Sequence, residues 1–340
     1  MKTPDHATDI AIIGAGPVGL FTVFEAGMLG MRCHVIEALD ALGGQCYALY
    51  PQKPIYDIPG IVRIDALDLV DQLAEQASPF APVYHLGQQV ATLTRTDAGR
   101  WRIAMTSGLE IEAAAVVVAA GVGAFGPNRP PLESLAEFEG KSVFYMVRRR
   151  EDMAGKRVVI AGGGDSALDW ALDLIGVAAH VTLVHRRRKF RASPHSERRL
   201  AELAQQGALE LVVPYQLVGL EGRDGVLDAV RVATLDGEER RLTADVLLAF
   251  YGLAMSLGPI NEWGLALERG HILVDADTCA TNLPGVFAVG DIITYPGKLK
   301  LILTGFAETA IAVRSAYPFV HPNRALHFEY STHTGVPGRE

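Results

Sequence analysis

Two glycine-rich segments of similar pattern constrain the fold of this chain more than any other feature. Residues 14–19 read GAGPVG and residues 162–167 read GGGDSA, and each follows a short apolar strand and opens a helical pattern. In such units the glycines permit a tight turn and let the backbone approach a pyrophosphate at the positive end of the helix. Two units therefore predict two dinucleotide sites. The residues predicted to line them are Gly14, Gly16 and Gly19 in the first, and Gly162, Gly164 and Ser166 in the second.

The two units differ at the end of their second strand. Residues 33–36 end in Glu37, whereas residues 181–184 run into a basic segment that contains Arg186, Arg187 and Arg191. A carboxylate at this place accepts hydrogen bonds from a ribose diol, and arginines pair instead with a ribose 2′-phosphate. The first site is therefore predicted to bind FAD and the second NADPH. For the arginines, a solvated surface remains the alternative.

Composition limits the classes of protein to which the chain can belong. It has 340 residues, of which 49% are hydrophobic and 21% charged, and this suggests two globular domains. The net charge of −8 excludes a generally basic nucleic-acid binder. No apolar stretch reaches the roughly 20 residues of a membrane helix, and no signal segment precedes the first strand, so a cytoplasmic protein without membrane contact is expected. An odd number of cysteines, three, indicates no disulfide framework.

The order of the expected elements predicts one domain inserted in another. A glycine- and proline-rich run, residues 121–131, is typical of a link between domains, and residues 249–252 are expected to form the return crossing. The predicted fold class is α/β, with two Rossmann-like, doubly wound, three-layer dinucleotide-binding domains, the second inserted in the first. The FAD-binding domain is predicted to comprise residues 1–120 and 250–340, and the NADPH-binding domain residues 121–249.

Each domain is also expected to contain a β-meander. In the first domain its strands are residues 90–94 and 100–104. In the second they are residues 211–220, 226–234 and 240–248. These segments combine β-branched residues with short turn signals.

Further motifs carry a family resemblance. They read LGGQ and ALYP after the first unit, HRRRKFRA after the second, and GD, YPGKLKLI and YST towards the C-terminus. With these motifs the chain resembles, over nearly its whole length, the ferredoxin/flavodoxin–NADP⁺ reductases of the thioredoxin-reductase-like type. The resemblance implies a homodimer in which the tail of one subunit covers the flavin of the other. It also implies FAD contacts from Gln45, Tyr50, Val90, Phe125, Asp291 and Thr332.

No side chain is assigned a catalytic role, because the flavin carries the chemistry. Tyr50 and Tyr330 are candidates for stacking on the flavin ring, with a core tyrosine and a surface aromatic as the respective alternatives. Asp291 could also simply cap a turn. No metal site is expected, because the histidines lack metal-ligand spacing.

The missing cysteine motif is the most informative departure from thioredoxin reductases. The chain has no Cys-x-x-Cys, and Pro51 stands where a partner five residues after Cys46 would lie. Electrons on the flavin are therefore expected to pass directly to ferredoxin or flavodoxin. Two alternatives remain: a reductase of another acceptor, such as a quinone or a disulfide protein, and a flavin redox sensor without turnover.

Overall fold

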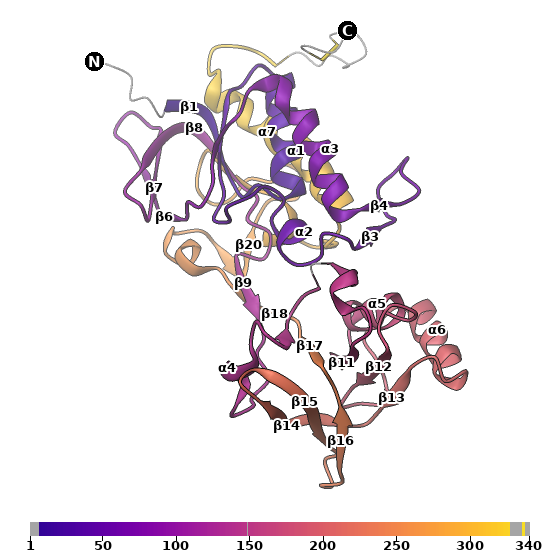
Figure 1. Ribbon diagram of the computed structural model, residues 1–340. Helices are drawn as coiled ribbons and strands as arrows, with labels where there is room; N and C mark the ends of the chain where they lie inside the picture. Colours follow the sequence, from indigo (N-terminus) through magenta and orange to yellow (C-terminus); the bar gives the residue numbers. More distant parts are fainter. Residues whose placement is uncertain (1–6, 148, 327–334, 337–340) are drawn as a thin grey trace. The chain divides into compact units, whose positions relative to one another are not determined.

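The computed structural model describes residues 7–147, 149–326 and 335–336, and the chain divides into two compact units (Figure 1). The outer unit comprises Met1–Ala124 and Met255–Glu340, and the inserted unit comprises Phe125–Ala254. The chain crosses between them in two short strands, β9 (Ala124–Pro127) and β18 (Leu253–Ser256). The boundaries expected from the sequence, after residues 120 and 249, lie close to these crossings.

The outer unit is built on a seven-stranded sheet. Five strands run parallel in the order β5-β2-β1-β8-β21, and the meander β6-β7 continues the sheet antiparallel from the first half of β8. The expected outer meander is thus confirmed. The strands are β1 (Ala7–Ile13), β2 (Cys33–Ile36), β5 (Val83–His85), β6 (Val90–Arg95), β7 (Trp101–Met105), β8 (Glu110–Val118) and β21 (Val286–Ala288).

Both faces of this sheet are buried, which explains why consecutive residues are apolar in the later parts of its central strands, at residues 10–13 of β1 and 113–118 of β8. Ile10 and Ile12 of β1 face a cluster formed with α1 and α7, whereas Ala11 and Ile13 face a second cluster formed with the meander and with residues 257–293. Figure 1 shows α1, α3 and α7 side by side. The helices are α1 (Pro17–Met28), α2 (Gln45–Ala48), α3 (Ala66–Ala77) and α7 (Ile302–Val320).

Short elements complete the outer unit. They form a hairpin before α3, a small three-stranded sheet, β19-β20-β22, and single 3₁₀ turns. These elements are β3 (Pro54–Ile55), β4 (Ile64–Asp65), η1 (Ser78–Phe80), η3 (Gly258–Glu262), β19 (Leu267–Glu268), β20 (His271–Leu273), η4 (Gly290–Ile292) and β22 (Ile293–Thr294).

The inserted unit repeats the same plan with a smaller, wholly parallel sheet in the order β10-β17-β11-β12-β13. Val158 and Ile160 of β11 face the helices α5 and α6, and Val159 and Ala161 face the antiparallel sheet β14-β15-β16. The parallel strands are β10 (Val143–Phe144), β11 (Arg157–Gly162), β12 (His180–Val184), β13 (Glu210–Val212) and β17 (Val246–Phe250). The other elements are α4 (Leu135–Phe138), η2 (Arg150–Met153), α5 (Asp165–Asp173), α6 (Pro194–Gln205), β14 (Gln216–Arg223), β15 (Val226–Ala233) and β16 (Glu239–Thr243).

The predicted fold class is confirmed, but two expected strands of the inserted unit are each two strands. Pro214 separates β13 from β14, because a proline has no amide hydrogen to continue a ladder. Asp245 lies between β16 and β17, and its carboxylate accepts a hydrogen bond from the Arg157 backbone amide at 2.8 Å. This bond fixes the start of β17 beside β11. Over the described part of the chain, no helix has both the length and the apolar character of a membrane span.

Candidate dinucleotide sites

Two of the three glycines in the first loop are required by the packing of the chain itself. Gly14 has a φ of +108°, and a Cβ there would lie 2.4 Å from the carbonyl oxygen of Ala119. A Cβ on Gly19 would lie 2.0 Å from the carbonyl oxygen of Gly14. Contact between backbones at these positions sets helix α1 close against the sheet.

The middle glycine has no such reason within the chain. Gly16 is the N-cap of α1 in an extended conformation, and a Cβ there would meet only the Gly43 carbonyl oxygen, at 4.0 Å. Gly164 is the N-cap of α5, and a Cβ there would meet only the Arg191 carbonyl oxygen, also at 4.0 Å. Because both N-caps are glycines, no N-cap side chain occupies the backbone amides at the start of either helix. Each loop therefore leaves open backbone at a helix N-terminus, and this fits a pyrophosphate.

Glu37 joins the first loop to the end of β2. Its side chain is 7% exposed, and its carboxylate accepts hydrogen bonds from the amides of Ala15 at 2.7 Å and Leu39 at 2.9 Å. Each carboxylate oxygen can accept a second hydrogen bond. The geometry thus positions the group and retains acceptor capacity for a ribose diol.

The segment predicted to contact the flavin lies across the first glycine loop. The Gly43 amide donates to the Ala15 carbonyl oxygen at 2.8 Å, and a Cβ on Gly44 would lie 3.2 Å from the Gly16 Cα. The next residue, Gln45, begins α2, and its Nε2 would lie 3.2 Å from a Cβ on Gly121. Gln45 is therefore brought between the loop and the end of β8.

Tyr50 and Asp291 lie in one neighbourhood, together with Cys46. The Tyr50 hydroxyl is hydrogen-bonded to the Cys46 thiol, and the Asp291 charge acts on both groups. Burial, followed by these contacts, raises the pKa of Tyr50 above its ordinary value. Asp291 itself lies in η4, directly after β21. The structure therefore brings together an aromatic and an acid that the sequence separates widely.

For the other residues predicted to contact FAD, the structure gives the position in the fold for two and describes neither of the remaining two. Val90 is 5% exposed and begins β6, paired with Met105. Phe125 lies in the crossing strand β9. Tyr330 and Thr332 lie outside the described residues.

In the second loop the packing partners differ. A Cβ on Gly162 would lie 2.6 Å from the Phe250 carbonyl oxygen and 2.9 Å from the Ala167 Cβ. A Cβ on Gly163 would lie 2.2 Å from the imidazole ring of His185. Ser166 is exposed in the first turn of α5. The end of β12 therefore determines which residue the loop can hold at its second position.

The basic segment folds back onto this loop. His185 and Phe190 stack with ring centroids 5.2 Å apart, and the Arg191 amide donates to the Gly163 carbonyl oxygen at 2.6 Å. Burial, the largest cause, and the nearby charges of the three arginines lower the pKa of His185 below its ordinary value, although a hydrogen bond with the Lys189 backbone acts in the opposite direction. The arginine side chains point to solvent, and within the described part of the chain none of them forms an ion pair. They are Arg186, Arg187 and Arg191.

A neutral ring supporting exposed guanidinium groups beside a helix N-terminus fits a phosphate monoester, because arginine binds such groups through two hydrogen bonds. The residues of the inserted unit therefore fit the 2′-phosphate of NADPH, and those of the outer unit fit FAD.

The cysteines offer no relay for electrons. Cys33, Cys46 and Cys279 are all free and buried. Burial raises the pKa of the Cys46 thiol to about 12, so it is not a thiolate near neutrality. Across residues 7–147, 149–326 and 335–336, no group of three or more metal-ligating side chains could hold a metal ion.

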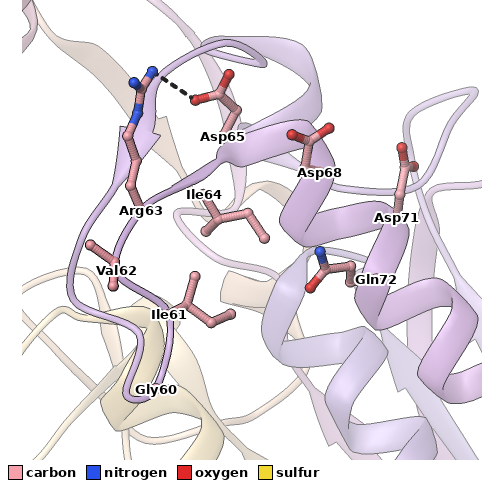
Figure 2. Close-up of a pocket in the computed structure, with 9 residues that line it drawn as sticks. All are labelled: Gly60, Ile61, Val62, Arg63, Ile64, Asp65, Asp68, Asp71 and Gln72. Carbon is pink, nitrogen blue, oxygen red and sulfur yellow. Dashed lines mark hydrogen bonds and ion pairs between the residues drawn. The ribbon is translucent and has the colours of Figure 1, made fainter.

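A hollow of about 810 Å³ lies elsewhere on the outer unit, between the loop that leads into β4 and helix α3 (Figure 2). Val62 on its rim is 92% exposed, and Arg63 pairs with Asp65 at 3.3 Å. Figure 2 also shows Asp68 and Asp71 on α3. None of the predicted site residues lines this hollow, so it is separate from the dinucleotide loops.

Two contributors were not identified from the sequence. His185 limits position 163 to glycine, and the additional glycine in the middle of GGG was the available signal. Glu308 is buried in α7 and hydrogen-bonded to the Gly290 amide beside Asp291. Its signal was an acid at helical spacing from the small residues Gly305 and Ala312.

Comparisons with known proteins agree with this geometry. Residues 8–316 match the pyridine nucleotide-disulphide oxidoreductase family. The chain is 63% identical to a ferredoxin–NADP reductase of Paramagnetospirillum magneticum, with 98% of each chain covered. It is 58% identical to a ferredoxin–NADP reductase of Rhodospirillum rubrum, with 97% of each covered.

Solved structures show the same fold. A Lactococcus lactis thioredoxin reductase in its FR conformation has a TM-score of 0.79 at 24% identity, with 93% of this chain and 99% of that one covered. A T. acidophilum thioredoxin reductase has a TM-score of 0.79 at 21% identity, with 92% and 98% covered. At these identities the likeness concerns the fold alone.

Proposed function

Since this chain belongs to the ferredoxin–NADP reductases of the pyridine nucleotide-disulphide oxidoreductase family, we propose that it transfers electrons between NADPH and a ferredoxin through bound FAD. FAD, when bound, links the two-electron chemistry of NADPH to the one-electron chemistry of an iron–sulfur protein. The observation that carries the proposal is the pair of glycine loops whose second strands end in residues of opposite charge. The strand ends in an acid in one unit and leads into arginines in the other.

The outer unit binds FAD and the inserted unit binds NADPH. In the outer unit Glu37 orients the adenosine ribose, while Gln45, Tyr50 and Asp291 hold the flavin end. In the inserted unit Arg186, Arg187 and Arg191 hold the 2′-phosphate, and the α5 N-terminus holds the pyrophosphate. Support comes from the open backbone at Gly16 and Gly164 and from the acceptor capacity that remains on Glu37.

The electron acceptor is external to the chain. Three separate, buried and protonated cysteines supply no dithiol that could pass electrons to a disulfide partner. This favours a one-electron carrier over a disulfide protein. Flavodoxin fits the same chemistry as ferredoxin and is included in the proposal. A homodimer, which the family resemblance supports, and a location in the cytoplasm complete the proposal.

The test mixes NADPH-reduced enzyme with ferredoxin, flavodoxin or thioredoxin in a stopped-flow instrument. Flavin reoxidation should be fast with either one-electron carrier and no faster with thioredoxin than with buffer. The matched variant Cys46→Ser should behave as the wild type once its FAD content is equal. Rapid turnover with thioredoxin, or a Cys46→Ser enzyme that keeps FAD but cannot reoxidise with ferredoxin, would refute direct transfer. No reoxidation with any acceptor would favour the redox sensor.

A further inference from the structure

A buried ion pair lies directly beside the segment that carries Asp291. Lys298 follows β22 and Glu308 lies in the second turn of α7, and their side chains are only 5% and 4% exposed. The Lys298 Nζ is 2.5 Å from Glu308 Oε1. Removing two charges from water costs more than their attraction commonly returns, so stability alone is weak grounds for such a pair.

The Glu308 carboxylate is the centre of the cluster. Its Oε1 accepts hydrogen bonds from Lys298 and from the Tyr295 hydroxyl, the latter at 2.7 Å. Its Oε2 accepts from the Gly290 backbone amide at 2.8 Å. One side chain therefore connects α7, the segment after β22, and the residue directly before Asp291.

The same region is in contact with the first glycine loop. A Cβ on Gly305 in α7 would lie 2.5 Å from a methyl group of Val18, which belongs to GAGPVG. The Gly290 backbone has a φ of +80°, and a Cβ there would lie 3.6 Å from the methyl groups of Val18. Backbone conformation at Gly290 therefore sets how η4, α7 and the first loop meet.

We propose that Lys298, Glu308 and Tyr295 form a positioning cluster that holds Gly290 and, through it, the Asp291 carboxylate in place to bind FAD. This inference depends on the proposed role of Asp291 in the FAD site. Lys298 and Tyr295 act through Glu308: the first balances its charge and the second fixes the orientation of its carboxylate. None of the three needs to touch the cofactor. The cluster gives a physical role to the YPGKLKLI motif, which supplies both donors.

Two charge-neutral double variants separate positioning from charge balance. Lys298→Met with Glu308→Gln removes both charges but keeps an amide oxygen for the Gly290 amide. Lys298→Met with Glu308→Leu removes both charges and the acceptor. FAD release from the diluted holoenzyme, followed by flavin fluorescence, should be at least about tenfold faster in the Leu variant than in the Gln variant. Lys300→Met is the matched control, because that exposed lysine pairs with His271 and should release FAD at the wild-type rate.

A double-mutant cycle with Asp291→Asn tests the mechanism, since residues that act through one another give non-additive effects. In the Gln background Asp291→Asn should accelerate FAD release about tenfold or more, and in the Leu background less than about threefold. Tyr295→Phe provides the same cycle if the Leu variant does not fold, with a smaller loss of coupling.

The outcomes distinguish the inference from the site on which it depends. Equal effects of Asp291→Asn in both backgrounds would overturn the positioning cluster and leave Asp291 as an FAD ligand. No effect of Asp291→Asn in the wild type would remove Asp291 from the FAD site, and the positioning cluster with it. A melting temperature that falls while FAD release stays unchanged would show that the cluster is only structural.

Discussion

The two glycine loops occupy the same place, between a strand and a helix, but they differ in backbone conformation and in neighbours. Gly14 has a φ of +108°, whereas the φ of Gly162 is not positive. In the outer unit the second loop residue is Ala15, whose amide donates to Glu37 at the end of β2. In the inserted unit the second loop residue is Gly163, which leaves room for the ring of His185 at the end of β12. The second loop residue and the residue at the strand end therefore both differ between the two units. A carboxylate reaches the loop by a hydrogen bond, whereas an imidazole needs the space of a missing side chain.

The last residue of the six-residue motif, Gly19 in one unit and Ala167 in the other, shows a second difference. Gly19 allows no side chain, because a Cβ would overlap the Gly14 carbonyl oxygen, whereas Ala167 carries its methyl group at the corresponding place. The inserted unit therefore accommodates a methyl group at a position where the outer unit accommodates none. The comparison teaches that this position must be glycine only where a backbone oxygen occupies the place of the side chain.

The largest effect is expected from removing the acid of the outer unit. Glu37→Ala leaves the amides of Ala15 and Leu39 without their acceptor, at about 1–3 kcal/mol for each buried donor, and removes the ribose contact. We expect FAD binding to weaken by roughly a hundredfold or more while NADP⁺ binding is unchanged. Flavin content after gel filtration and NADP⁺ calorimetry measure the two. Equal losses of both dinucleotides would show that Glu37 serves the fold and not one site.

Exchanging glycine and alanine at the last residue of each motif should affect the two units unequally. Gly19→Ala places a methyl group 2.0 Å from a backbone oxygen and should cost about 1–3 kcal/mol, because both partners belong to the backbone. Ala167→Gly should cost about 1 kcal/mol, the usual penalty for glycine inside a helix. Urea unfolding of the holoenzyme measures both. A Gly19→Ala protein as stable as the wild type would mean that α1 can shift after all.

The arginines should determine the choice between NADPH and NADH. Changing Arg186 and Arg187 together to Ala removes charge-assisted hydrogen bonds of about 1.5–3 kcal/mol each. The KM for NADPH should rise at least about tenfold and that for NADH should stay constant. Steady-state ferricyanide reduction with each nucleotide is the measurement. A parallel rise in both KM values would place the arginines outside the 2′-phosphate site.

The smallest effect concerns the ring that replaces the acid. The pKa of His185 is lowered, so the folded protein favours the neutral ring and the unfolded chain binds the proton more readily. This contribution to stability is therefore complete above the ordinary histidine pKa of about 6.5 and is lost as the pH falls below it. His185→Phe keeps a ring for stacking but cannot be protonated. The melting temperature of the variant minus that of the wild type should increase by up to about 3 °C as the pH falls from 8 to 5. A constant difference across that range would contradict the assignment.

Local patterns predicted much of this molecule. The two strands that flank each glycine turn, both turns and the outer meander follow from apolar runs next to turn residues, because backbone conformation there depends on near neighbours. The sequence could not divide residues 211–220 and 240–248 correctly, since β13 and β17 are defined by partners distant in the chain. Glu308 was missed for a similar reason: the donors that satisfy it come from other segments.

The sequence by itself determined that the chain contains two dinucleotide loops and that one is followed by an acid and the other by arginines. These features are local, because a glycine turn and the residue at a strand end need only their own segment. The tertiary structure alone decided which glycines are required by packing and which are left open, as at Gly16 and Gly164. It also brought Asp291 near enough to Tyr50 for its charge to act on the hydroxyl, and it placed Lys298 against Glu308. Such contacts join residues that only the folded sheet brings together, and no spacing in the sequence encodes a distance between them.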